Sequence, residues 1–177
     1  MLIKLNFAII LLLLCTAFAT AQDFAPEVQR AEMKKMELMI GRWEGAGWIQ
    51  RGPVRESFHG SETIQRKLDG LAVLVEGKFF GDVKPGEAEK VIHETLAVVS
   101  FDPIEKGYKF RTYLATGSSG SFDGKLIEGG WQWGFEFAGG QVRYTIKFTT
   151  ETWFEIGEFS KDGKTWMKNF EMTLKRK

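Results

Sequence analysis

Side chains capable of acid–base or metal chemistry are few in this sequence of 177 residues. It has two histidines, His59 and His93, and a single cysteine, Cys15. The Asp and Glu residues are scattered, and the only close group of serines lies in a turn-like run, GSSGSFDG. A Ser/His/Asp arrangement or a zinc site needs more such groups at suitable spacing. The sequence therefore indicates no catalytic residues and no metal ligands, and an enzyme is the less expected class.

The two histidines differ in their surroundings. His59 shares a strand face with Ser, Thr, Gln and Lys residues, which predicts a solvated surface position. His93 lies in VIHETLAVV, whose two faces are both largely apolar, so the direction of its side chain stays open. Pointing inward, His93 would be a candidate ligand contact, although a lone histidine is more often a hydrogen-bonded structural residue.

Polar side chains on otherwise apolar strand faces are the remaining candidates for binding. In the segment 54–68, Glu62 and Arg66 lie on the face that also carries the apolar residues. Tyr144 and Lys168 interrupt apolar faces in two later segments. A charge inside a protein is costly unless it is paired or hydrated. We therefore expect these groups either to pair as structural struts near a rim or to orient the polar head of a ligand.

Aromatic side chains supply the apolar wall of the same predicted site. Trp131 and Trp133 share one face of a strand-like segment, Tyr144 lies on the next segment, and Phe170 shares a face of the last segment with Trp166. We expect Trp131, Trp133, Tyr144 and Phe170 to line one end of a cavity, with the charged pair near the opposite end or the mouth. Ordinary core packing is the alternative for the same residues.

The segments that carry these residues form a series of short antiparallel strands. From Trp43 onward, apolar and polar residues alternate, and turn signals such as Gly52-Pro53 and Asp162-Gly163 recur at roughly 8–14 residues. The pattern predicts about nine or ten strands. Strands with one apolar face are best buried when the sheet closes on itself. We therefore predict an all-β fold, a single antiparallel up-and-down barrel, with a two-sheet sandwich as the alternative.

One segment has a helical pattern, the run PEVQRAEMKKMELMI at residues 26–40. Pro26 suits a helix start, and Gly41 suits a left-handed cap after the last turn. No Pro, Gly or Ser-rich linker divides the rest of the chain. We therefore predict an N-terminal segment and helix over residues 22–42, followed by one barrel domain over residues 43–177.

The first 21 residues have the features of a secretory signal peptide. They carry one charge, a short apolar run, and the small-x-small pattern Ala19-Thr20-Ala21 before Gln22. We expect cleavage there and an exported protein, periplasmic or secreted, with no stable membrane insertion; an uncleaved anchor is the alternative. Cys15 lies in the removed part, so the mature chain would hold no disulfide.

The charge balance argues against nucleic-acid binding. The sequence has 24 Lys and Arg residues, one of them in the predicted signal peptide, against 23 Asp and Glu residues. The longest basic cluster is the short LKRK end. A nucleic-acid interface needs a basic patch or stripe, and this sequence supplies none.

The stretch GRWEGAGW at residues 41–48 resembles the Gly-x-Trp opening of the calycin barrels, the lipocalins and fatty-acid-binding proteins. Its fuller Gly-x-Trp-x-Gly-x-Gly form is similar to nitrobindin-like haem barrels and to uncharacterised secreted bacterial lipocalin-like proteins. The latter likeness is the closer one and extends to LDGLAVLVEGKF, VVSFDPIEKGYKF and FSKDGKTWMKNFEMTLKRK. In calycins a basic residue of the last strand packs on the opening Trp, so the resemblance implies a contact between Trp43 and Arg176. Strand parity agrees, and the glycines would let the first strand bend.

The resemblance to lipocalin-like barrels and the aromatic strand faces together predict a binding protein. We expect it to be exported and to hold a hydrophobic or amphipathic small molecule in a cavity. The nitrobindin likeness implies haem as the cofactor, yet those barrels use a histidine near the C-terminus, and this sequence has none after His93. No other cofactor is expected. A haem-dependent enzyme or sensor, and a packed barrel acting as a protein-interaction module, are the alternatives.

Overall fold

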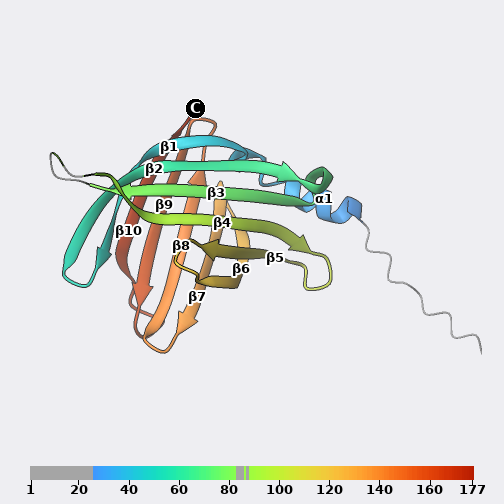
Figure 1. The fold of residues 1–177 in the computed structure, drawn as a ribbon. Helices are drawn as coiled ribbons and strands as arrows, with labels where there is room; N and C mark the ends of the chain where they lie inside the picture. Colours follow the sequence, from blue (N-terminus) through green and yellow to red (C-terminus); the bar gives the residue numbers. More distant parts are fainter. Residues whose placement is uncertain (1–25, 83–85, 87) are drawn as a thin grey trace, which may run out of the picture.

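Ten antiparallel strands close into a barrel in the computed structural model, which describes residues 26–82, 86 and 88–177 (Figure 1). Each strand pairs with the next along the chain, and β1 pairs with β10 to complete the ring. The predicted up-and-down barrel is confirmed, and the two-sheet sandwich is excluded. The signal peptide predicted over residues 1–21 lies outside the described residues.

The strands are β1 (Gly41–Arg51), β2 (Val54–Lys67), β3 (Ala72–Gly81), β4 (Lys90–Asp102), β5 (Gly107–Leu114), β6 (Ser119–Ile127), β7 (Gly130–Phe137), β8 (Gly140–Phe148), β9 (Thr152–Ser160) and β10 (Met167–Arg176). Consecutive strands run in opposite directions, so their connections alternate between the two ends of the barrel. We call the end with the connections after β1, β3, β5, β7 and β9 the mouth. The opposite end, where β1 begins and β10 ends, is the base.

The N-terminal helical segment is broken, whereas the sequence pattern predicted one helix through Ile40. Helix α1 spans Pro26–Lys34, and a separate 3-10 helix, η1, spans Glu37–Met39. The break turns Met39 into the barrel, where its carbonyl oxygen accepts a hydrogen bond from Trp43 Nε1 at 2.8 Å. Gly41 has a φ of 142° and opens β1, so it is not the predicted left-handed helix cap.

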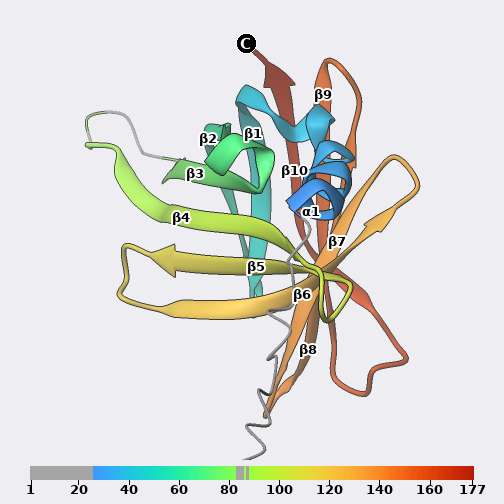
Figure 2. The same cartoon turned by 90° about the vertical axis from the view of Figure 1, so that its right-hand side faces the viewer.

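Helix α1 lies over the base of the barrel (Figure 2). The Tyr108 hydroxyl donates to Glu32 Oε2 at 2.9 Å, which ties α1 to β5. Arg30 pairs with Asp69 at 2.9 Å, which ties α1 to η2 (Leu68–Gly70), the 3-10 turn between β2 and β3. The base is therefore covered. In the described part of the chain, none of the helices has the length and apolar character needed to cross a membrane.

Trp43 and Arg176 make the contact that the calycin resemblance implied. Trp43 is 0 % exposed, and Arg176 Cζ lies 4.1 Å from the centre of its ring. The guanidinium also donates to Ile40 O at 2.6 Å and to Leu38 O at 2.8 Å. The last strand is therefore fastened to the segment that precedes the first. Gly41 leaves room for this guanidinium, because a Cβ there would collide with Nη1.

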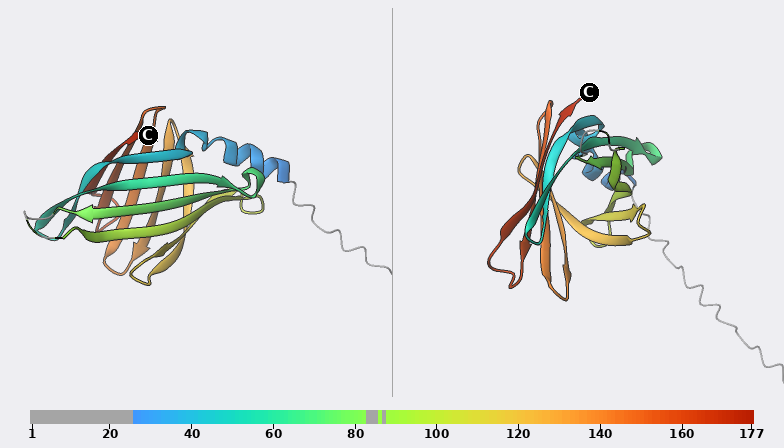
Figure 3. Two further views of the ribbon diagram at one scale, coloured as in Figure 1. Left: turned by 45° about the horizontal axis from the view of Figure 1, so that its top comes forward. Right: turned by 60° about the vertical axis from the view of Figure 1, so that its left-hand side comes forward.

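Two glycines let β1 pass close to β10 as it curves from the base to the mouth (Figure 3). A Cβ at Gly45 would collide with the carbonyl oxygen of Thr173, and a Cβ at Gly47 with that of Glu171. Any larger residue would therefore push the two strands apart at the seam that closes the barrel. This explains why the opening stretch alternates bulky and small residues.

The alternation of β10 is broken by a bulge between Lys168 and Phe170. Phe170 faces the interior, whereas Lys168 pairs with Glu171 at 2.7 Å, with about half of its side chain exposed. Trp166 precedes β10 and lies against Arg143, whose Cζ is 4.0 Å from the ring centre. The prediction that Trp166 and Lys168 share the inward face of Phe170 is therefore wrong, because the extra residue of a bulge shifts the parity.

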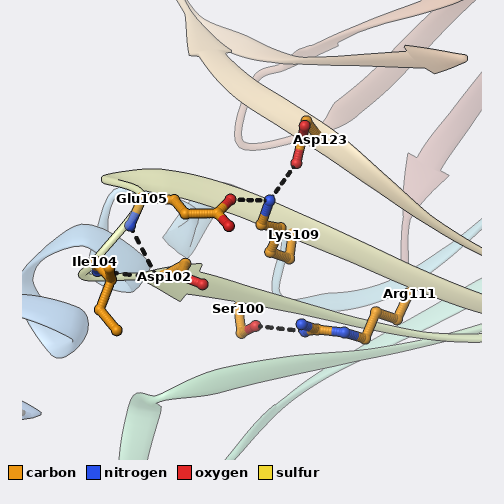
Figure 4. A network of polar contacts seen from close by, with 7 residues as sticks. All are labelled: Ser100, Asp102, Ile104, Glu105, Lys109, Arg111 and Asp123. Carbon is orange, nitrogen blue, oxygen red and sulfur yellow. Dashed lines mark hydrogen bonds and ion pairs between the residues drawn. The ribbon is translucent and has the colours of Figure 1, made fainter.

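Several charged side chains on the outside of the barrel are paired, as at the turn between β4 and β5 (Figure 4). Asp102 Oδ1 accepts the backbone N–H groups of Ile104 and Glu105 at 2.9 and 3.0 Å. Lys109 lies between Glu105 and Asp123 and meets Asp123 at 2.6 Å. The two backbone hydrogen bonds stabilise the carboxylate and lower the pKa of Asp102. These exposed acids therefore have the partners that a carboxylate needs.

Candidate ligand-binding site

A cavity of about 420 Å³ occupies the interior of the barrel. All ten strands contribute lining side chains, and Met39 of η1 closes it toward the base. Small-molecule sites are concave, mostly apolar, and about 300–1,000 Å³ in volume. The interior is therefore not filled by its own side chains and has room for a small ligand.

Aromatic side chains form the middle of the cavity wall. Trp133 and Tyr144 are paired across β7 and β8 and stack with their centroids 4.7 Å apart at an angle of 18°. Phe110 lies 4.6 Å from Trp133, and Phe170 meets Tyr144 edge-on at 5.7 Å. Trp131 continues the row and is 3 % exposed. The four aromatic residues singled out in the sequence therefore line one cavity, although Trp131 lies deep in it.

Gly157 of β9 makes room for two of these rings. A Cβ at this position would lie 2.8 Å from Phe170 Cβ and 2.9 Å from Tyr144 Cε1. Contacts this short require a neighbour to move, and both neighbours are held by stacking, Tyr144 on Trp133 and Phe170 on Phe58. The shape of the wall therefore depends on a missing side chain that the sequence analysis did not single out.

Glu62 lies toward the base of the cavity. In the sheet register it stands beside Trp43 on β1 and Gly77 on β3. Its carboxyl group rests on Gly77, where a Cβ would come within 2.7 Å of Oε1. Glu62 is 7 % exposed, and among the described residues its Oε2 has no hydrogen-bond partner. Burial, and then the charge of Glu155, raise the pKa of Glu62 to about 8, so the neutral acid predominates at pH 7.

Glu155 is a second buried acid, which the sequence analysis missed. It is 8 % exposed, and its Oε2 accepts a hydrogen bond from Trp153 Nε1 at 3.1 Å. This bond favours the carboxylate, but burial outweighs it and raises the pKa of Glu155 to about 7. The signal was available in TWFEIGEFS, where Glu155 interrupts the face of Trp153 and Gly157. The same argument had identified Glu62.

Arg51 and His93 line the opposite part of the cavity, toward the mouth. The ring of His93 lies 6.2 Å from that of Phe79, at an irregularity in the pairing of β3 and β4. Loss of hydration, and then the charge of Arg51, lower the pKa of His93, so its imidazole is neutral at pH 7. His93 therefore lines the cavity from the rim of the mouth, where the residue is still exposed to solvent.

Arg66 does not line the cavity. It pairs with Glu37 of η1, and 48 % of its side chain is exposed. By the alternation of β2, the side chain of Arg66 should point inward. Arg66 lies near the end of β2, however, where the strand extends past the base of the cavity. The prediction that Glu62 and Arg66 both point inward, near the end opposite the aromatic residues or near the mouth, is wrong for Arg66, which is a strut outside the base. Glu62 does point inward, but it lies near the base. His59 lies on the outer surface and pairs with Glu89, as its polar face predicted.

The cavity is therefore polarised along its length. Its titratable groups are Arg51 and His93 toward the mouth, Glu62 and Glu155 toward the base, and Tyr144 in the wall. Burial, and then the charge of Glu155, raise the pKa of Tyr144 to about 12, which keeps the phenol neutral. Over the described ranges, no three His, Cys, Asp or Glu side chains converge as they would around a metal ion.

Comparison with known proteins identifies the fold without a family. No protein-family model matches the sequence, and no curated protein matches it. Among solved structures, the crystal structure of Rv2717c from M. tuberculosis matches with a TM-score of 0.60 and 8% sequence identity, over 82% of this chain and 96% of that chain. At this identity the likeness shows the fold alone. The closed ten-strand antiparallel barrel fits a calycin-like fold.

Proposed function

We propose that this chain is a binding protein that holds a small apolar or amphipathic molecule in its barrel cavity. The observation that carries the proposal is the cavity of about 420 Å³ with its wall of stacked aromatic rings. Each buried methylene contributes about 0.8 kcal/mol. A chain of about ten carbons therefore gains about 8 kcal/mol before the cost of association is subtracted. Rings that are already packed lose little freedom when a ligand arrives.

The same proposal includes the setting in which the protein acts. We infer from residues 1–21 that the chain is exported and works in the periplasm or as a secreted protein. Kinship with the secreted lipocalin-like barrels is part of this proposal, supported by the packing of Arg176 on Trp43.

Haem is a second candidate occupant because His93 lines the cavity and is neutral. A neutral imidazole nitrogen is the form that ligates iron, and bound haem would supply redox or gas-binding chemistry. His93 would hold the iron, and Arg51 beside it would pair with a propionate. The buried acids Glu62 and Glu155 would gain no favourable interaction with haem, because its macrocycle is apolar and its propionates are anionic. For this reason an organic ligand with a polar head is the favoured occupant.

Ligand retention tests the proposal. The mature protein is purified without denaturation, analysed by native mass spectrometry, and extracted with organic solvent. We expect a small apolar or amphipathic molecule to accompany the protein, or an added fluorescent apolar probe to bind with one-to-one stoichiometry. An absorption band in the Soret region would identify haem instead.

A pair of variants locates the binding. Trp133→Asp places a charge in the cavity wall and is expected to abolish uptake of the probe. Tyr113→Asp is the matched control, because Tyr113 is an exposed aromatic residue on the outer face of β5. Circular dichroism checks that both variants fold. Binding by Trp133→Asp as tight as that of the wild type would contradict the proposal.

A further inference from the structure

We propose that the cavity recognises an amphipathic amine, whose cationic head is received by Glu62 and Glu155 near the base. The inference rests on the proposed function, because it names the chemistry of the ligand that the same cavity would take. The inference comes from two acids at the base of an otherwise mostly apolar cavity, one of which has an oxygen without a hydrogen-bond partner among the described residues.

Glu62 is a buried acceptor that lacks a partner. Its Oε2 makes no hydrogen bond with any residue that the structure describes, although the residue is 7 % exposed. An unsatisfied buried polar group costs about 1–3 kcal/mol, and more when it is charged. A ligand that donates a hydrogen bond here recovers this loss. Gly77 preserves the position of the carboxyl group, because a side chain there would displace it.

Glu155 approaches the same end of the cavity from β9. Its hydrogen-bond donor, Trp153, packs edge-on against Trp43 with centroids 6.0 Å apart. Trp43 in turn stands beside Glu62 in the register of β1 and β2. The two acids are thus linked through one pair of packed indoles, and both line the same cavity. The charge of Glu155 also raises the pKa of Glu62. A single cation placed between them would interact with both.

The charges of the cavity favour a cation over an anion at this end. The titratable lining groups come from β1, β2, β4, β8 and β9, and the described lining residues of β3, β5, β6, β7, β10 and η1 add none. The two basic groups of the cavity, Arg51 and His93, lie toward the mouth. An anionic head at the base would meet two acids and no cation. An ammonium head would meet two acceptors while its apolar body contacts the Trp133 and Tyr144 rings.

Binding of an ammonium head changes the protonation of the acids. Without a ligand, burial raises the pKa of both Glu62 and Glu155, and their mutual repulsion keeps a proton on the pair. An ammonium ion stabilises the carboxylate, so a carboxylic acid gives its proton to the solvent as the ligand binds. The affinity for the amine therefore rises by up to about tenfold per pH unit between about pH 6 and 8, and levels off above.

Three ligands with the same tail test the inference: decylamine, decanol and decanoate. Each is titrated into the full mature protein by calorimetry at pH 7.5. We expect decylamine to bind about tenfold or more tightly than the other two, as suits a hydrogen bond to a charged group. Repeating the amine titration at pH 6.5 in buffers of different ionisation enthalpy should show release of up to about one proton per amine.

The double variant Glu62→Gln/Glu155→Gln should lose about tenfold or more in amine affinity and release no proton, while decanol binding stays within about threefold. Glu76→Gln, on the exposed outer face of β3, is the matched control. Should the double variant fail to fold, the single variants and the wild-type proton release decide the matter.

The outcomes separate the two proposals. Equal binding of the three ligands, a preference for decanoate, or full amine affinity in the folded double variant overturns the amine inference and leaves the binding function standing. Failure of all three ligands and of the apolar probe overturns both.

Discussion

Replacing Glu62 by glutamine should make the stability of the barrel less sensitive to alkaline pH. The pKa of Glu62 is about 8 in the folded protein, whereas its usual value is 4.5. Between these values the folded state binds more protons than the unfolded state. The free energy of unfolding therefore falls as the pH rises through this range. Glutamine has nearly the same shape and cannot ionise, so it removes this part of the fall.

The size of the effect follows from the pKa difference. About 3.5 pH units at 1.36 kcal/mol per unit correspond to about 5 kcal/mol as an upper limit. Part of this belongs to the interaction with Glu155, and water entering the cavity reduces it further. We therefore expect Glu62→Gln to gain about 2–4 kcal/mol relative to the wild type on going from pH 5 to pH 9. At pH 5 the two proteins should be of similar stability, since both side chains are neutral there.

Urea unfolding followed by tryptophan fluorescence at pH 5, 7 and 9 measures this difference. Glu76→Gln is the control, because the side chain of Glu76 is exposed and its loss should leave the pH profile unchanged. Parallel profiles for the wild type and Glu62→Gln would refute the reasoning. They would mean that the carboxyl group is hydrated or paired in solution.

Three further predictions concern the base, the wall and the N-terminus. Trp43→Ala should cost about 3–5 kcal/mol in unfolding free energy and Arg176→Ala less, with coupling in a double-mutant cycle; additive losses would mean that the two do not touch. Gly157→Ala should weaken probe binding, because its Cβ would lie 2.8 Å from Phe170 Cβ, and unchanged affinity would show that the wall adapts freely. N-terminal sequencing of exported protein should begin at Gln22, and an intact Met1 would contradict signal cleavage.

Local periodicity was sufficient to predict the barrel and its aromatic wall. Alternation in β7 and β8 placed Trp131, Trp133 and Tyr144 on inward faces, because successive side chains of a strand point to opposite sides. Repeated turns and a single helical segment left the antiparallel barrel as the economical way to bury those faces. The Trp43 and Arg176 contact followed from a family resemblance with which parity agreed.

Local periodicity failed wherever a strand departs from regular pairing. Arg66 has inward parity, but it lies beyond the end of the barrel interior. The part of a strand that lines the cavity depends on where the neighbouring strands and helices end, and alternation within one strand does not reveal this. Lys168 was misplaced because the bulge before Phe170 inserts a residue that no alternation rule anticipates. The helical run broke before Met39, since burial of that side chain in the barrel outweighed continuous helix geometry.

The sequence by itself determined that Glu62 interrupts an apolar strand face. The same alternation rule, applied to the segment 152–160, would also have placed Glu155 on an inward face. The sequence did not determine that the two acids act on one another. In the ring, β2 and β9 are separated only by β1 and β10, and this proximity arises when the first and last strands pair. Closure of the barrel also excludes water from both carboxyl groups and places Arg51 toward the other end. Burial and distance are properties of the assembled interior, so the tertiary structure alone decided the polarity of the cavity.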